Sequence, residues 1–191
     1  MPLPNPAEPP SQRDDRSATP PTALIVTLAM DSEAAARFTA MRRAHFPPER
    51  NWLDAHITLF HALPMEAEDR VVHDVRALAA AIPAFDLAVD RLLFLGGGVA
   101  YGLTSPDATQ LRRTLADRWA SLLGRQDSRW HGRLHVTVQN KVPPAQARQL
   151  LKTLEHDFVP HPIGAVGVQV WHYLGGPWRL VAACPFGGSA R

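Results

Sequence analysis

The sequence predicts one α+β domain in which a set of strands and helices occurs twice in nearly the same order. Three observations carry this prediction. Some segments place apolar residues at helical spacing, and others show the alternation or the short apolar runs of strands. Prolines and glycines separate these segments from one another. Two long stretches of the chain also match each other without gaps.

The first half of the domain follows a proline-rich stretch over residues 1–21, which has too few apolar side chains to offset its ordering entropy. We expect that stretch to be a disordered tail and the domain to span residues 22–187. Runs rich in β-branched residues predict strands, and stripes at helical spacing between capping residues and prolines predict helices. The predicted elements are a strand over 23–30, a helix from Asp31 or Ser32 to Phe46, a strand over 56–63, a helix over 66–82 and a strand over 85–95.

The second half repeats this order after a turn at Gly96-Gly97-Gly98 and ends with one strand more. Ser105-Pro106 is a typical cap and first-turn pair, and Pro143-Pro144 opens another helix. The predicted elements are a strand over 99–104, a helix from Ser105 to about Gly124, a strand over 134–142, a helix from Pro143 to Phe158, and strands over 165–174 and 178–185.

A constant shift of 79 residues (135 − 56) relates the two halves. It carries His56 to His135 and Thr58 to Thr137, and it also carries two prolines and a Leu-Gly-Gly turn to identical residues. We interpret this frame as an internal repeat over about 23–98 and 99–186. Two such units packed about a pseudo-twofold axis would form a bilobal fold with a central cleft.

The composition excludes several classes of protein. Of the 191 residues, 46% are hydrophobic and 20% are charged, as in soluble globular domains. No apolar run approaches the roughly 18 residues of a membrane span, so we expect no membrane partner. The net charge of +2 permits an anionic substrate but lacks the clustered charge of a nucleic-acid wrapper. Because Cys184 is the only cysteine and no signal peptide is evident, we expect a cytoplasmic protein.

Two His-x-Thr motifs occupy equivalent positions of the repeat. Side chains two apart on a strand share a face, so His56 points with Thr58, and His135 points with Thr137. Imidazole can accept or donate a proton near neutral pH, and a hydroxyl beside each ring can donate hydrogen bonds to phosphoryl oxygens. Asp54 is the only carboxylate near either motif, so we predict neither a metal nor a cofactor. A site of this kind is typical of acid–base chemistry on a phosphodiester, with a bell-shaped rate profile between about pH 5 and 8.

The two motifs, His56-Ile57-Thr58-Leu59 and His135-Val136-Thr137-Val138, resemble the paired motifs of the two-histidine phosphoesterase superfamily. That superfamily includes RNA 2′,3′-cyclic phosphodiesterases and 2′-5′ RNA ligases. The resemblance implies a LigT-like fold of two curved, mainly antiparallel sheets with helices outside and the four motif residues in a central groove. It also implies action on an RNA end or nucleotide that carries a cyclic or 2′,5′-linked phosphate.

Other side chains are candidates for substrate binding. Arg133 and Lys141 share the strand parity of His135, so either could contact phosphate from the same groove. Aromatic residues could stack a nucleobase, although packing in the core is the alternative for each; they are Phe60, Tyr101, Trp171 and Tyr173. His131 lies in the loop before the second motif, at the expected rim. His61, an odd offset from His56, is expected on the opposite face of an unbulged strand.

The sequence therefore favours a monomeric hydrolase that opens 2′,3′-cyclic phosphates with two histidines. Three alternatives stay open. A ribose hydroxyl in place of water would make the same site a 2′-5′ RNA ligase. An RNA-binding module that keeps the fold without turnover is the second alternative. A histidine-based metal site is the third, and it lacks a third ligand at suitable spacing.

Overall fold

The computed structural model describes residues 22–188, and its first half contains the five predicted elements. The predicted tail over residues 1–21 lies outside the described residues. The elements are β1 (Ala23–Met30), α1 (Ser32–His45), β2 (Ile57–Leu63), α2 (Glu68–Ala81) and β3 (Phe85–Phe94), with short 3-10 turns at Pro48–Arg50 and Met65–Ala67. Asp31 caps α1, because its carboxylate accepts a hydrogen bond from the backbone N–H of Ala34 at 2.8 Å.

The second half also follows the prediction, with one short helix added. Its elements are β4 (Val99–Thr104), α3 (Pro106–Arg118), α4 (Arg125–Ser128), β5 (Leu134–Gln139), α5 (Pro144–Asp157), β6 (His161–Tyr173) and β7 (Trp178–Pro185). Ser105 caps α3 as predicted, through a 3.3 Å hydrogen bond from the N–H of Ala108. Strand β6 begins at His161, four residues earlier than predicted.

Two further predicted boundaries were wrong because the elements end earlier than predicted. The helix predicted to reach Gly124 ends at Arg118, since Trp119 leaves helical geometry to bury its ring. The Trp119 indole N–H donates to the carboxylate of Asp74 at 2.9 Å. The strand predicted to reach Val142 ends at Gln139, because Lys141 adopts a left-handed backbone with φ of 63°.

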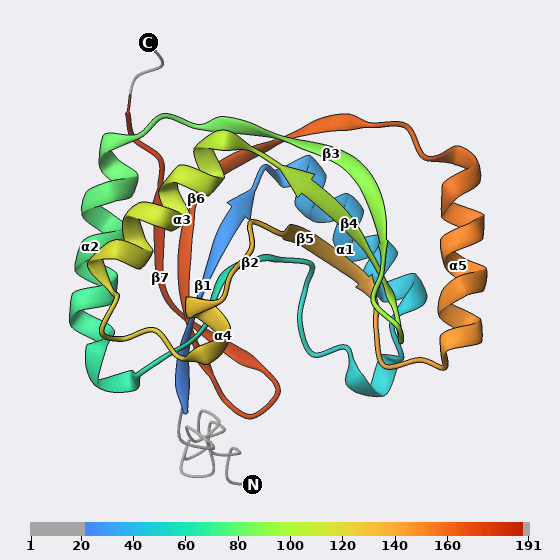
Figure 1. The fold of residues 1–191 in the computed structure, drawn as a ribbon, viewed down its shortest axis with the longest axis horizontal. Coiled ribbons are helices and arrows are strands. Elements are labelled where there is room, and N and C mark those ends of the chain that lie inside the picture. Colours follow the sequence, from blue (N-terminus) through green and yellow to red (C-terminus); the bar gives the residue numbers. More distant parts are fainter. Residues whose placement is uncertain (1–21, 189–191) are drawn as a thin grey trace, which may run out of the picture.

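The strands form one antiparallel sheet that closes on itself. Its order is β1-β2-β5-β4-β3-β6-β7, and β6 also pairs with β1 (Figure 1). Six strands therefore form a barrel and β7 extends it from β6. The two separate sheets expected from the family resemblance are thus one continuous sheet, joined where β2 meets β5. Read around the barrel, each strand and its counterpart in the other half lie symmetrically about the β2–β5 junction. This order agrees with the internal repeat, which stays a prediction.

The four longer helices lie outside the sheet. In Figure 1, α2 and α3 lie on one side of the molecule and α1 and α5 on the other. Helix α1 packs against β5, α2 against β6 and β7, and α5 against β3 and β4. None of the described helices is long and apolar enough to cross a membrane.

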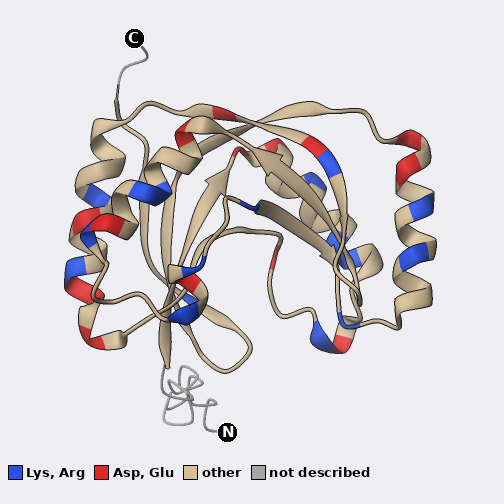
Figure 2. Ribbon diagram, in the orientation of Figure 1, with Lys and Arg blue, Asp and Glu red and all other residues tan. Residues whose placement is uncertain are grey.

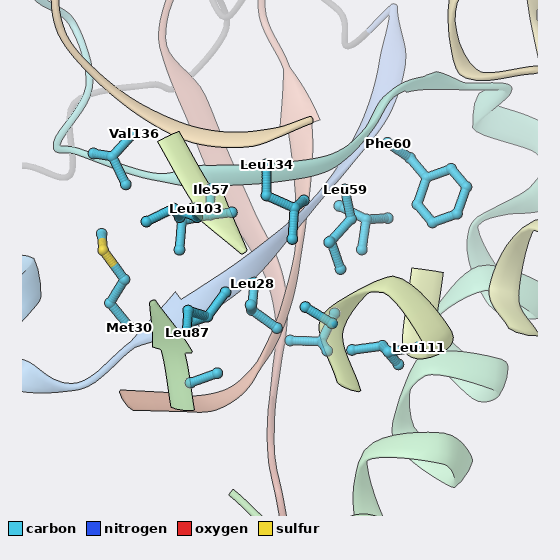
Figure 3. Packing of buried hydrophobic residues seen from close by; sticks show 14 of the residues in the cluster. Leu28, Met30, Ile57, Leu59, Phe60, Leu87, Leu103, Leu111, Leu134 and Val136 are labelled. Carbon is cyan, nitrogen blue, oxygen red and sulfur yellow. The ribbon is translucent and has the colours of Figure 1, made fainter. Parts of the chain in front are cut away.

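The core consists of alternating strand residues from both halves (Figure 3). On β5, Leu134, Val136 and Val138 are buried, whereas His135 and Thr137 between them are half-buried. Ile57 on β2 is likewise wholly buried, and Thr58 beside it is half-buried. Burial of the alternate apolar residues thus directs the motif residues to the other face of the sheet.

Candidate active site

The two predicted motifs meet at the junction of β2 and β5. The register pairs Ile57 with Val136. Because antiparallel strands run in opposite directions, this pair places His56 across from Thr137 and Thr58 across from His135. Cross-strand neighbours have Cβ atoms about 5 Å apart, and diagonal ones such as the two histidines are about 7 Å apart. The four side chains therefore form a small square on one face of the sheet, with a histidine and a threonine alternating around it.

The same face continues across the neighbouring strands. Thr58 pairs with Thr27 of β1, and His135 pairs with Gly102 of β4, which pairs in turn with Arg91 of β3. A Cβ at Gly102 would lie 2.6 Å from Cγ of Arg91, so the arginine side chain crosses the space that glycine leaves open. Arg91 donates to the hydroxyl of Thr104 at 3.0 Å. This cation at the edge of the square was not predicted, since its strand position has meaning only once β3 and β4 are paired.

His56 is held in one tautomer and shielded from water. Its Nδ1 donates a hydrogen bond to the backbone carbonyl of Asp54 at 2.8 Å, because a carbonyl can only accept. The ring packs against that of Trp178, with centroids 4.5 Å apart. Burial, together with the smaller effects of the charges of Arg42 and His135, lowers the pKa of His56 from 6.5 to about 4. His56 is therefore neutral at pH 7, and its Nε2 is free to accept a proton.

His135 has a similar but looser environment. Its Nδ1 lies 3.4 Å from the backbone carbonyl of Arg133, so the hydrogen bond is weaker than that of His56. Burial lowers the pKa of His135 below 6.5. The two rings thus differ in the length of the hydrogen bond that orients Nδ1.

A cavity of about 610 Å³ opens beside His56. Three tryptophans line it, and they are Trp52, Trp171 and Trp178. The indole N–H of Trp171 donates to the hydroxyl of Thr27 at 2.9 Å, which orients its ring beside the motif square. Trp52 is 65% exposed and comes from the loop that precedes the first motif. Of the aromatic candidates, Trp171 is the one that the structure places at this cavity.

Arg42 ties the loop before the first motif to the strand of the second. Its buried guanidinium donates to the side chain of Asn51 at 2.8 Å and to the carbonyl of Leu53 at 3.0 Å. It also donates to the carbonyl of Thr137 at 3.0 Å. Burial lowers the pKa of Arg42 to about 10, so it stays charged at neutral pH. Nothing in the spacing of the sequence could have identified this anchor, because its acceptors lie in two segments that are far apart in the chain.

The expectation for His61 was wrong because the pairing of β2 with β1 is irregular at two places, between Thr58 and Phe60 and again between Phe60 and Leu63. Val26 of β1 pairs with Phe60 and Thr27 pairs with Thr58, so Leu59 is the extra residue. Leu59 and Phe60 are both wholly buried, and the half-buried His61 returns to the face of Thr58. Its Nδ1 lies 3.1 Å from the carboxylate of Asp127.

Two aromatic candidates lie in the core instead of the groove. Phe60 is wholly buried, since the bulge turns it inward, and its ring packs edge-on to Trp119 at 4.9 Å. Tyr101 pairs with Val136 and so faces away from the square; it is 7% exposed and packs against Phe38. Neither ring is available to stack a nucleobase. Tyr173, on β6 beyond Trp171, is half-buried and is not among the residues that line the cavity beside His56.

The remaining candidates lie outside the square. Lys141 follows the end of β5, so the parity that placed it beside His135 does not apply, and it lines a separate hollow near Pro143. Arg133 is exposed immediately before β5, where its backbone carbonyl supports His135. His131 is exposed in the same loop.

Neither the charges on the outer helices nor the metal-binding side chains among the described residues point to a further site. Figure 2 shows acidic and basic residues interspersed along α2, whereas on α5 the basic residues precede the acidic ones at the end of the helix, so neither helix carries charges of one sign alone. Recognition of an anion would therefore depend on groups in the groove. Within residues 22–188, no group of three or more His, Cys, Asp or Glu side chains is placed to hold a metal ion.

Comparisons with known structures support this fold. A Thermus thermophilus protein, TT0787, superposes with a TM-score of 0.59 at 12% identity, covering 88% of this chain and all of the other. Escherichia coli LigT in complex with NADP+ superposes with a TM-score of 0.53 at 18% identity, covering 88% of this chain and 99% of LigT. LigT in complex with 3′-AMP gives the same TM-score at 19% identity, covering 86% and 99%. No curated protein matches the sequence.

The family model described as the 2′-5′ RNA ligase superfamily matches residues 30–177. This match spans most of the chain and includes both His-x-Thr motifs. The antiparallel barrel and the pairing of the motifs across β2 and β5 agree with it. The chain belongs to the 2′-5′ RNA ligase superfamily, within the two-histidine phosphoesterases.

Proposed function

We propose that the protein is a metal-independent phosphodiesterase that opens 2′,3′-cyclic phosphates at the ends of RNA or on nucleotides. One observation carries this proposal: the register at the β2–β5 junction alternates histidine and threonine around a square. A phosphoryl group centred on that square would have an imidazole on either side and two hydroxyls toward its non-bridging oxygens. In-line displacement at phosphorus needs this arrangement of one base, one acid and two donors.

The low pKa of His56 supports a proposed division of roles between the two histidines. His56 is the base, because its pKa of about 4 keeps Nε2 unprotonated over the working range of pH. It takes a proton from water as the water oxygen bonds to phosphorus. His135, in its protonated form, gives its proton to the ribose oxygen as the bond from phosphorus to that oxygen breaks. The product is a phosphate monoester, and a proton exchange with water returns both rings to their starting states.

Thr58 and Thr137 donate hydrogen bonds to the non-bridging oxygens. Charge on these oxygens grows as the attacking water bonds to phosphorus, so donors placed in advance stabilise the transition state more than the substrate.

The nucleoside would occupy the cavity beside His56. Indole rings stack on bases without regard to sequence, and Trp171 and Trp178 line this cavity next to the square. The structures of LigT with 3′-AMP and with NADP+ support a nucleotide ligand for this fold.

Turnover of 2′,3′-cyclic AMP and of oligonucleotides with cyclic ends, measured in EDTA, tests the proposal. We expect His56→Ala and His135→Ala each to lose at least about 100-fold in kcat/KM. His156→Ala, an exposed histidine on α5, is the matched control and should keep full activity. Undiminished turnover in either motif variant would refute the mechanism, and activity lost only in EDTA would favour a metal site. Joining of RNA ends without hydrolysis would identify a ligase, and RNA binding without turnover would identify a binding module.

A further inference from the structure

His61 lies on the groove face of β2 because of the bulge at Leu59. It thus joins His56 and His135 on that face, and it lies beyond Thr58 in the same strand. Its side chain is 37% exposed, so it remains open to a ligand. His61 is the last of the charges that lower the pKa of His56 and of His135, after burial in both cases.

Asp127 fixes the orientation of His61. The Asp127 side chain is 2% exposed, and its carboxylate accepts hydrogen bonds from the backbone N–H groups of His61 and Ala62 at 3.0 and 3.1 Å. The carboxylate is thus the acceptor for the N–H groups of two successive residues in the irregular part of β2. The same carboxylate lies 3.1 Å from Nδ1 of His61. A carboxylate only accepts, so Nδ1 carries the proton and Nε2 is the free nitrogen.

The buried guanidinium of Arg112 contacts the backbone of Asp127. Arg112 of α3 is 4% exposed and donates to the backbone carbonyl of Asp127 at 2.6 Å. Its guanidinium also stacks on the ring of Phe60, 4.2 Å from the centroid. Although burial alone would raise the pKa of Asp127, the hydrogen bonds from His61 and Ala62 lower it below 3.8. Asp127 is therefore ionised at neutral pH. Its hydrogen bonds to His61 and Ala62 connect α4 to β2.

We propose that His61 is a third substrate-binding histidine, whose Nε2 contacts a phosphoryl oxygen held between the two His-x-Thr motifs, and that Asp127 is its positioning residue. The inference rests on the proposed function only in taking phosphate as the ligand of this groove. With an N–H on both nitrogens, His61 would donate from Nδ1 to the carboxylate of Asp127 and from Nε2 to the phosphoryl oxygen. Arg112 faces the backbone of Asp127 and not the imidazole, so it does not oppose a positive charge on that ring directly.

A titration with inorganic phosphate, followed by ¹⁵N NMR of the imidazoles, tests this role without requiring turnover. In the wild type we expect an Nδ1–H tautomer for His61 and a change at its Nε2 when phosphate binds. His61→Phe keeps the size of the ring and removes both nitrogens, and it should bind phosphate about 10- to 100-fold more weakly, as expected for a hydrogen bond to a charged group. His61→Gln restores a donor and should recover part of the affinity. His156→Gln should bind as the wild type does.

Asp127→Asn separates orientation from contact. Asparagine retains one acceptor for the backbone, so we expect the fold to persist and the His61 tautomers to mix, with phosphate affinity between those of the wild type and His61→Phe. Affinity of His61→Phe within twofold of the wild type would overturn the proposal. A wild type that binds no phosphate would also overturn it.

Kinetics distinguish this inference from the proposed function. If cyclic nucleotides are substrates, His61→Phe should raise KM about tenfold with a smaller change in kcat, because the contact exists before the chemical step. If no cyclic nucleotide is turned over, the proposed function fails, and the phosphate titration still decides whether His61 binds an anion.

Discussion

Replacing Trp178 with alanine should raise the pKa of the proposed base, His56. The indole ring lies 4.5 Å from the imidazole and covers it from β7. Burial is the main reason that the pKa of His56 falls from 6.5 to about 4, which corresponds to about 3 kcal/mol between its two protonation states. Opening one face of the ring to water removes part of this cost. We expect a rise of at least about one pH unit, with 6.5 as the upper limit.

The assay is an NMR titration of the His56 imidazole, together with the acid limb of the kcat/KM profile. Both should move to higher pH in Trp178→Ala. Trp178→Phe keeps an aromatic cover and should shift the limb less. Trp52→Ala is the matched control, because Trp52 lines the same cavity but is 65% exposed. A pKa near 4 in the folded Trp178→Ala variant would refute the reasoning, since the shielding would then come from elsewhere.

Four further predictions follow from the same geometry. The proposed base, His56, has a pKa of about 4, and the proposed acid, His135, has a pKa below 6.5, so kcat/KM should be greatest between these two values. This range is lower than the window of about pH 5 to 8 predicted from unperturbed imidazoles. A rate–pH profile with its centre above pH 7 would contradict the assigned roles. Because the folded-state pKa of His56 is depressed, stability should be lost as pH falls from 6.5 to about 4, by about 3 kcal/mol at most; urea unfolding should show a smaller loss in His56→Gln. Thr58→Val and Thr137→Val keep the side-chain shape and should each lower kcat/KM about 100-fold with little change in unfolding midpoint; wild-type rates would exclude the hydroxyls from the site. Arg42→Met leaves three acceptors without their donor and should lower the free energy of unfolding by about 3 kcal/mol. Urea unfolding followed by tryptophan fluorescence measures this loss. Arg43→Met, at an exposed arginine, is the control and should change stability by less than about 0.5 kcal/mol.

Local patterns were sufficient to predict most of the elements. Asp31 and Ser105 cap their helices as predicted, because capping depends on residues only three positions apart. The alternation of β5 placed His135 and Thr137 on one face for a similar reason, since the period of a strand is two. The boundaries that failed lie where a distant contact intervenes, as at Trp119, whose indole bonds to Asp74 of another helix.

The candidate site shows the same division. The four motif residues could be identified from their recurrence, and their facing pairs needed only the register at Ile57 and Val136. The sequence could not tell which of the aromatic and cationic candidates lie beside the motifs. The face of each residue beyond the motif depends on bulges and on where β5 ends. Phe60 and Lys141 were misplaced for these two reasons.

The two His-x-Thr motifs, the strand face that each pair shares and the order of the elements could all be read without coordinates, because faces and elements follow from the periods of strands and helices. Three contacts became known from the folded chain: Trp178 covers His56, Arg42 joins the two motif segments, and Asp127 orients His61. Each of these contacts joins residues dozens of positions apart. Their geometry depends on how the sheet closes and bulges, which no local period encodes.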